Sequence, residues 1–162
     1  MGEVLALPAA RGAGLAAALL AGGAAAGEID VVKDYVLQRC LPSISAGLEM
    51  PLHGLTAEDI EACGLPATRY TGEDPRVSLI KMKDVPICMV VSSPSDTPAF
   101  AAFVDEWFDN DETPFELISE QSDQMGDSRV FSWDRGVALV EVRATVNDAQ
   151  SAAILSVSLV GK

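Results

Sequence analysis

Three cysteines and one histidine are the side chains of this 162-residue sequence that are best suited to thiol or metal chemistry. Cys40, Cys63 and Cys88 lie far apart, without the Cys-x-x-Cys spacing that brings two thiolates onto one metal ion. His53 is the only histidine, so these residues make a poor zinc set. We therefore predict no metal site and no cofactor.

A disulfide is the other use of these cysteines, and it depends on the compartment. In an oxidising compartment, one disulfide and one free thiol are the natural arrangement. We favour a Cys40–Cys88 bond, which ties the end of the first predicted helix to the second predicted strand and leaves Cys63 free. Closing that loop stabilises the fold by roughly 4 kcal/mol on the chain-entropy estimate. In a cytosolic protein, all three cysteines would instead be reduced and partly buried.

Motifs for nucleophilic or nucleotide chemistry are missing from the sequence. It contains no Gly-x-Ser-x-Gly elbow, no phosphate-binding glycine loop and no His-Glu-x-x-His motif. A Ser-His or Cys-His mechanism would have to use His53, which sits in a loop between Pro51 and Gly54. We predict a non-enzymatic protein without catalytic residues.

Acidic side chains outnumber basic ones by 24 to 11, which gives a formal net charge of −13. Nucleic acids and anionic membrane surfaces need Lys and Arg to displace their counterions, so we exclude both as partners. We therefore expect the partner to be an unknown protein or a small ligand. Solubility alone is a sufficient reason for such a charge.

An acidic belt between Asp105 and Asp127 holds nine of the carboxylates and no Lys or Arg. Its segment 109–112 faintly resembles the start of a calcium loop, but Pro114 stands where an EF-hand requires glycine. We therefore expect a solvated, charged edge and no metal site.

An uncharged Ala/Gly/Leu run covers residues 12–27 and follows Arg11. It has about the length of a secretory apolar region, and Ala24 and Ala26 have the small-x-small spacing of a signal-peptidase site. We predict a signal peptide over residues 1–26 and a single domain over residues 27–162. The alternative is a disordered arm on a cytosolic protein.

Two short motifs and a later cysteine accompany that leader: Cys40-Leu41-Pro42, Gly64-Leu65-Pro66 and Cys88. Together they resemble a group of small uncharacterised exported bacterial proteins with Cys-Leu-Pro near the mature N-terminus. The resemblance implies a periplasmic location and a Cys40–Cys88 disulfide, and it implies no activity.

Two N-terminal helices are predicted from apolar spacing and capping residues. The first covers residues 28–41 and is expected to end because Pro42 drives the preceding residue out of the helical region. The second covers residues 57–63, with Thr56 as its N-cap and Gly64 at its end.

A third helix has the clearest amphipathic pattern. Ser95 or Asp96 is suited to cap it, and Pro98 suits its first turn. Its apolar side chains share one stripe, which we expect to pack on a sheet and not to line a ligand groove: Phe100, Phe103, Val104, Trp107 and Phe108.

β-branched, alternating runs predict the strands. They cover residues 77–82, 87–92, 115–119 and 129–133, and residues 137–160 read as two strands around a polar turn. Short connections favour antiparallel pairing. We predict an α+β fold with an antiparallel sheet of about five to six strands, one main amphipathic helix on one face and two N-terminal helices.

Two functions are compatible with these features. The first is an exported, periplasmic or secreted, non-enzymatic binding or structural module. The alternative is a cytosolic acidic chaperone or adaptor that binds a partner protein in an apolar groove formed by the uncovered sheet face or the aromatic helix.

Overall fold

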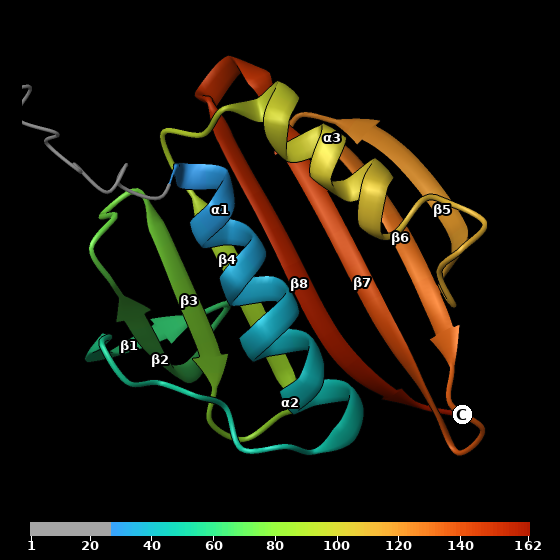
Figure 1. The fold of residues 1–162 in the computed structure, drawn as a ribbon, viewed down its shortest axis with the longest axis horizontal. Coiled ribbons are helices and arrows are strands. Elements are labelled where there is room, and N and C mark those ends of the chain that lie inside the picture. The colour runs from blue at the N-terminus through green and yellow to red at the C-terminus, as the bar shows by residue number, and fades with distance from the viewer. Residues whose placement is uncertain (1–26) are drawn as a thin grey trace, which may run out of the picture.

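Eight antiparallel strands form one sheet in the computed structural model, which describes residues 27–162 (Figure 1). Their spatial order is β1-β2-β3-β4-β8-β7-β6-β5, so β1 and β5 form the two edges and β8 lies inside the sheet. The strands are β1 (Thr56–Ala62), β2 (Leu65–Thr71), β3 (Val77–Met82), β4 (Ile87–Ser92), β5 (Glu116–Asp123), β6 (Gly126–Asp134), β7 (Ala138–Asn147) and β8 (Ala152–Gly161).

Two helical segments cover one face of this sheet. The first is continuous and consists of α1 (Glu28–Lys33), a π-helical stretch η1 (Asp34–Cys40) and α2 (Leu41–Ala46); the second is α3 (Thr97–Trp107). In Figure 1 they lie next to each other in front of the sheet, where η1 contacts β4 and α3 contacts β7 and β8. A short 3-10 turn, η2 (Asp148–Gln150), links β7 to β8.

The predicted fold class is therefore wrong in its strand and helix counts. Eight strands replace the expected five to six, because residues 57–63 form β1 rather than a helix and residues 65–71 form β2. One continuous helix at the N-terminus replaces the expected two.

The first helix does not end at Pro42. The N–H of Leu41 donates a hydrogen bond to the carbonyl of Val36, five residues earlier. The helix therefore already has π-helical hydrogen bonds at the residue before Pro42. The helix then continues through α2 and ends at Gly47, which adopts a left-handed conformation (φ 65°).

A tight turn explains why residues 57–63 form a strand. Cys63 (φ 52°) and Gly64 (φ 75°) are both left-handed, which is the conformation of a two-residue type I′ hairpin loop. Ala62 pairs with Leu65 across this loop, and the pairing continues to Thr56 and Thr71. Gly64 is therefore a hairpin residue and not a helix end.

The C-terminal hairpin and α3 agree with their patterns. Val140, Val142 and Ala144 on β7 and Leu155 and Val157 on β8 are buried on the face under the helices. The Asp96 carboxylate accepts a hydrogen bond from the Ala99 N–H (3.1 Å) and caps α3. Phe100, Phe103 and Val104 of α3 and the adjoining Phe108 are buried. Trp107 departs from the prediction, because it is 41% exposed and does not pack fully on the sheet.

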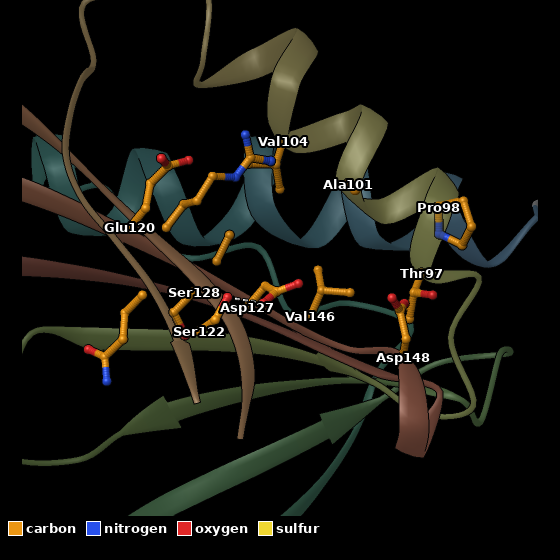
Figure 2. A pocket seen from close by; sticks show the side chains of 13 residues that line it. Thr97, Pro98, Ala101, Val104, Glu120, Ser122, Asp127, Ser128, Val146 and Asp148 are labelled. Carbon is orange, nitrogen blue, oxygen red and sulfur yellow. Dashed lines mark hydrogen bonds between the residues drawn. The ribbon is translucent and has the colours of Figure 1, made fainter. Parts of the chain in front are cut away.

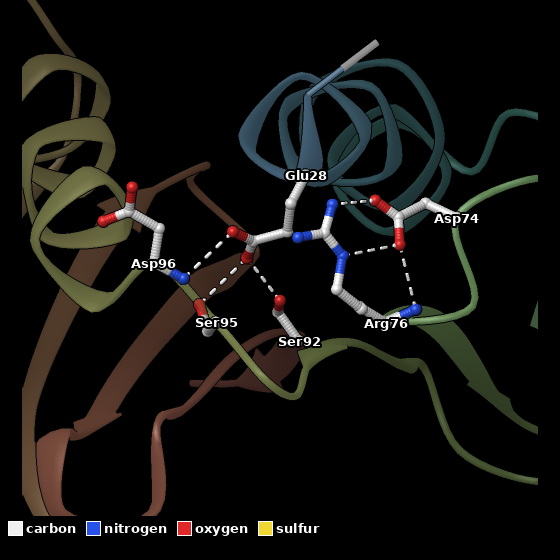
Figure 3. A network of polar contacts seen from close by, with 6 residues as sticks. All are labelled: Glu28, Asp74, Arg76, Ser92, Ser95 and Asp96. Carbon is white, nitrogen blue, oxygen red and sulfur yellow. Dashed lines mark hydrogen bonds and ion pairs between the residues drawn. The ribbon is translucent and has the colours of Figure 1, made fainter. Parts of the chain in front are cut away.

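A buried carboxylate fixes the start of α1 (Figure 3). Glu28, only 6% exposed, accepts hydrogen bonds from the Ser92 and Ser95 hydroxyls and from the Asp96 N–H (3.0 Å). The Arg76 guanidinium lies between Glu28 and Asp74 (Figure 3) and donates two hydrogen bonds to the Asp74 carboxylate, at 3.0 and 2.6 Å. These bonds hold the pKa of Asp74 below its ordinary value.

Close packing also fixes the middle of the first helix. A Cβ at Gly72 would lie 2.7 Å from the Tyr35 hydroxyl oxygen, so only glycine fits at this position without a shift. Burial raises the pKa of the Tyr35 phenol.

The predicted signal peptide, residues 1–26, lies outside the described residues. No helix within residues 27–162 has both the length and the apolar character needed to span a bilayer.

Candidate binding groove

A groove of about 550 Å³ runs between α3 and the part of the sheet formed by β5, β6 and β7 (Figure 2). It exists because the helices cover β3, β4, β8 and β7 but leave the outer strands uncovered on the same face. All eight residues of β5 are exposed.

The floor of the groove is apolar. Ala144 and Val146 come from the helix-facing side of β7, and Val104 comes from the buried stripe of α3. Pro98 and Ala101 extend this surface along the upper wall, as Figure 2 shows. The size and apolar character of this floor suit an aliphatic side chain.

The rim is acidic and polar. Glu120 from β5, Asp127 from β6 and Asp148 from η2 border the groove (Figure 2). Within residues 27–162, none of these three carboxylates is in an ion pair with Lys or Arg. The Ser122 hydroxyl donates a hydrogen bond to Asp127, which fixes that carboxylate but leaves its charge in place.

The single cation at the groove is already neutralised. Arg129 on β6 pairs with Asp105 at 2.6 Å and with Asp109 at 3.0 Å. The groove and these two partners therefore carry net negative charge, which attracts a cationic ligand.

The acidic belt is a solvated edge, as predicted. Its nine carboxylates are all exposed, and they follow the end of α3, the connecting loop, β5 and the β5–β6 turn. No three His, Cys, Asp or Glu side chains within residues 27–162 are grouped so as to hold a metal ion.

A second hollow of about 390 Å³ lies at the other end of α3. Trp107, Phe115 and Trp133 line it together with Leu37 and Leu41 of the N-terminal helix. Phe115 and Trp133 meet edge to face with their ring centroids 5.7 Å apart, and the Arg135 guanidinium lies 4.5 Å from the Trp133 ring centroid. Arg135 thus covers one face of the half-buried Trp133 ring.

The structure pairs the two cysteines that the sequence favours. Cys40 and Cys88 are bonded, with their Cα atoms 5.6 Å apart, and both are completely buried. The bond joins the last residue of η1 to the central strand β4 and so holds the helix to the sheet. A structural disulfide of this kind persists in an oxidising compartment.

The other candidate chemical groups do not converge. Cys63 is exposed at the β1–β2 turn, and His53 is exposed in the loop between α2 and β1. Neither residue lines the groove or the aromatic hollow.

The groove itself was not predicted from the sequence, because its lining comes from five successive elements whose arrangement in space depends on tertiary packing. The only sequence signal was the absence of Lys and Arg between Asp105 and Asp127, which marks part of the rim. Comparison with known proteins gives no matching family model, no matching curated protein and no matching solved structure.

Proposed function

We propose that this chain is a small exported, non-enzymatic binding module that holds a positively charged segment of a partner protein in the groove between α3 and β5–β7. The observation that carries the proposal is the combination of an apolar floor, formed by Val104, Ala144 and Val146, with a rim of carboxylates that have no cationic partner among residues 27–162. An aliphatic side chain suits the floor, while neighbouring Lys or Arg side chains suit the rim.

Three features support export. The Cys40–Cys88 disulfide is fully buried in the centre of the fold, which favours an oxidising compartment. The uncharged leader with its Ala24-x-Ala26 site and the resemblance to small exported proteins point to the periplasm.

Two observations support a binding role without catalysis. The groove lining contains no cysteine, histidine or lysine, and its one arginine is held by two carboxylates. His53 and Cys63 are on exposed turns outside it.

Charge reversal at the rim tests the groove. The probe is a short extended peptide in which Lys and Val alternate at every second position with Ser between them, so that both types lie on one face of a strand. Its counterpart replaces Lys with Glu. We expect the Lys peptide to bind more tightly, and Asp148→Lys to weaken its binding by about fivefold or more at low ionic strength, with the difference shrinking as salt is added. Isothermal titration or fluorescence anisotropy measures both affinities.

Glu61→Lys is the matched control. It makes the same change in net charge at an exposed position on β1, outside the groove. If it weakens the peptide as much as Asp148→Lys does, the attraction comes from the overall charge, and the groove is not the binding site.

Mass spectrometry of the native protein tests export. The proposal expects a mature N-terminus at Gly27 and two oxidised cysteines. An intact Met1 with three free thiols would contradict it.

A cytosolic acidic chaperone or adaptor is the second candidate. It is favoured by the apolar open face of the sheet, where Ile80, Met89 and Val91 are half-buried and Ile154 is 37% exposed. The same mass-spectrometric measurement separates the two candidates, because a cytosolic protein would retain reduced thiols.

A further inference from the structure

The outer edge of β5 is a row of backbone groups without a strand beside it. β5 pairs with β6 on one side, and no strand within residues 27–162 pairs with its other side. Edge strands of this kind present free N–H and C=O groups that accept another strand.

The two edges of the sheet differ in charge. On β1, Glu58 pairs with Arg69 at 2.5 Å and Asp59 pairs with Lys83 at 2.9 Å. On β5, Glu116, Glu120 and Asp123 make no ion pair with any Lys or Arg of the described chain. Within residues 27–162, three carboxylates of β5 thus lack a cationic partner, whereas on β1 Glu61 alone does.

This charge selects against a second copy of the chain. Two β5 strands in contact would bring carboxylates against carboxylates, and β5 against β1 would add further acidic residues. The bulge between Leu117 and Ser119 bends β5 and brings Leu117 and Glu120 onto one face, so an added strand has to match that bend. A basic strand gains from the same charges that repel an acidic one.

We infer that β5 accepts an extended basic segment of the partner protein as an added strand, with a Lys or Arg placed opposite Glu120 and an apolar residue placed opposite Leu117. Both residues lie on the face under the helices, because Glu120 pairs with Arg129 and Leu117 with Phe131. Leu117 is 41% exposed and offers the apolar contact, while Glu120 offers the charge at the border of the groove.

This inference rests on the proposed function, since it gives the binding mode and sequence character of the partner segment. A side chain opposite Glu120 stands at the rim described above, so the added strand and the groove would form one continuous site. The partner is then recognised by backbone pairing along β5 and by basic and apolar side chains that share one face of the added strand, two residues apart.

The experiment uses the disulfide-bonded protein and the Lys-Val alternating peptide in two forms. The second form carries N-methyl groups on alternate residues, which removes the hydrogen-bond donors of one peptide edge but keeps charge and side chains. We expect at least a tenfold loss of affinity for the methylated form, together with amide-exchange protection in β5 when the unmodified peptide is bound.

Two variants separate a charge effect at β5 from one elsewhere. Glu120→Gln should weaken the unmodified peptide about two- to fivefold. Glu61→Gln on the opposite edge is the matched control and should leave the affinity unchanged.

The outcomes distinguish the two proposals. If both peptide forms bind equally and Asp148→Lys still lowers their affinity, the groove proposal is supported and the strand-addition inference is wrong. Protection that appears in β1 instead of β5 also overturns the inference. If no Lys-containing peptide binds, both proposals fail.

Discussion

Removing the Cys40–Cys88 bond should cost a substantial part of the stability of this fold. The two residues are 48 apart in sequence, so the bond closes a long loop in the unfolded chain. The chain-entropy relation gives about 4 kcal/mol for a loop of that size at 25 °C. Domains of this size are stable by about 5–15 kcal/mol, so the loss is roughly a quarter to four-fifths of the total.

Urea unfolding followed by tryptophan fluorescence measures the effect. We expect the midpoint of the reduced wild-type protein to fall well below that of the oxidised protein, and the slope to rise because the unfolded chain expands. The double substitution Cys40→Ala with Cys88→Ala should be less stable still, since both sulfur atoms are fully buried and their removal leaves cavities.

Cys63→Ser is the control, because its exposed side chain makes no disulfide. It should change stability by no more than about 0.5 kcal/mol. If the reduced wild-type protein unfolds at the same urea concentration as the oxidised one, the bond does not constrain the unfolded chain as argued.

Three further predictions concern packing, turn geometry and pH. Gly72→Ala should destabilise the fold by about 1–3 kcal/mol by thermal or urea unfolding, because its Cβ would meet a buried phenol oxygen, whereas Gly161→Ala, which meets nothing within 4 Å, should be nearly neutral. Cys63→Asn should raise stability by up to about 1 kcal/mol, because Asn tolerates the left-handed conformation of the β1–β2 turn; a loss would contradict the type I′ assignment. The hydrogen bonds from Arg76 lower the folded pKa of Asp74, so they stabilise the fold above about pH 4 and are lost as pH falls through that lowered pKa. Asp74→Asn should therefore be less stable than wild type at neutral pH, and the difference should shrink in acid; a constant difference from pH 7 to pH 2 would refute it.

Local patterns were sufficient where burial is one-sided. The alternation in residues 138–147 and 152–161 and the stripe of α3 predicted the buried faces of β7, β8 and that helix. Each of these elements packs one face on the core, so its apolar residues recur with the period of a strand or of a helix.

Local sequence patterns gave the wrong secondary structure where few side chains are buried, because no regular spacing of apolar residues is then required. β1, with the sequence Thr-Ala-Glu-Asp-Ile-Glu-Ala, is an edge strand with mostly exposed side chains, and its Ala and Glu residues favour a helix. Its strand conformation depends on the turn at Cys63-Gly64 and on pairing with β2, which a propensity does not include. Pro42 also did not mark a helix end, because the helix passes it through the wider hydrogen-bond pairing of η1, which the sequence pattern does not reveal.

The groove is beyond such reasoning altogether. It results from the distance between α3 and the outer strands, which is fixed by contacts between segments far apart in sequence. The rim charges could be counted from the sequence, but their lack of cationic partners could not, because Arg129 reaches back to Asp105 and Asp109 on another element.

The interior position of β8 determines how this protein can fold. β8 follows every other strand along the chain, yet it is the strand that joins β4 to β7. Until residues 152–161 are in place, the chain has two separate half-sheets with unsatisfied apolar borders at Val90 and Val142. A chain with a damaged last strand should therefore aggregate rather than form a smaller stable domain, and native structure can appear only after that strand has been made.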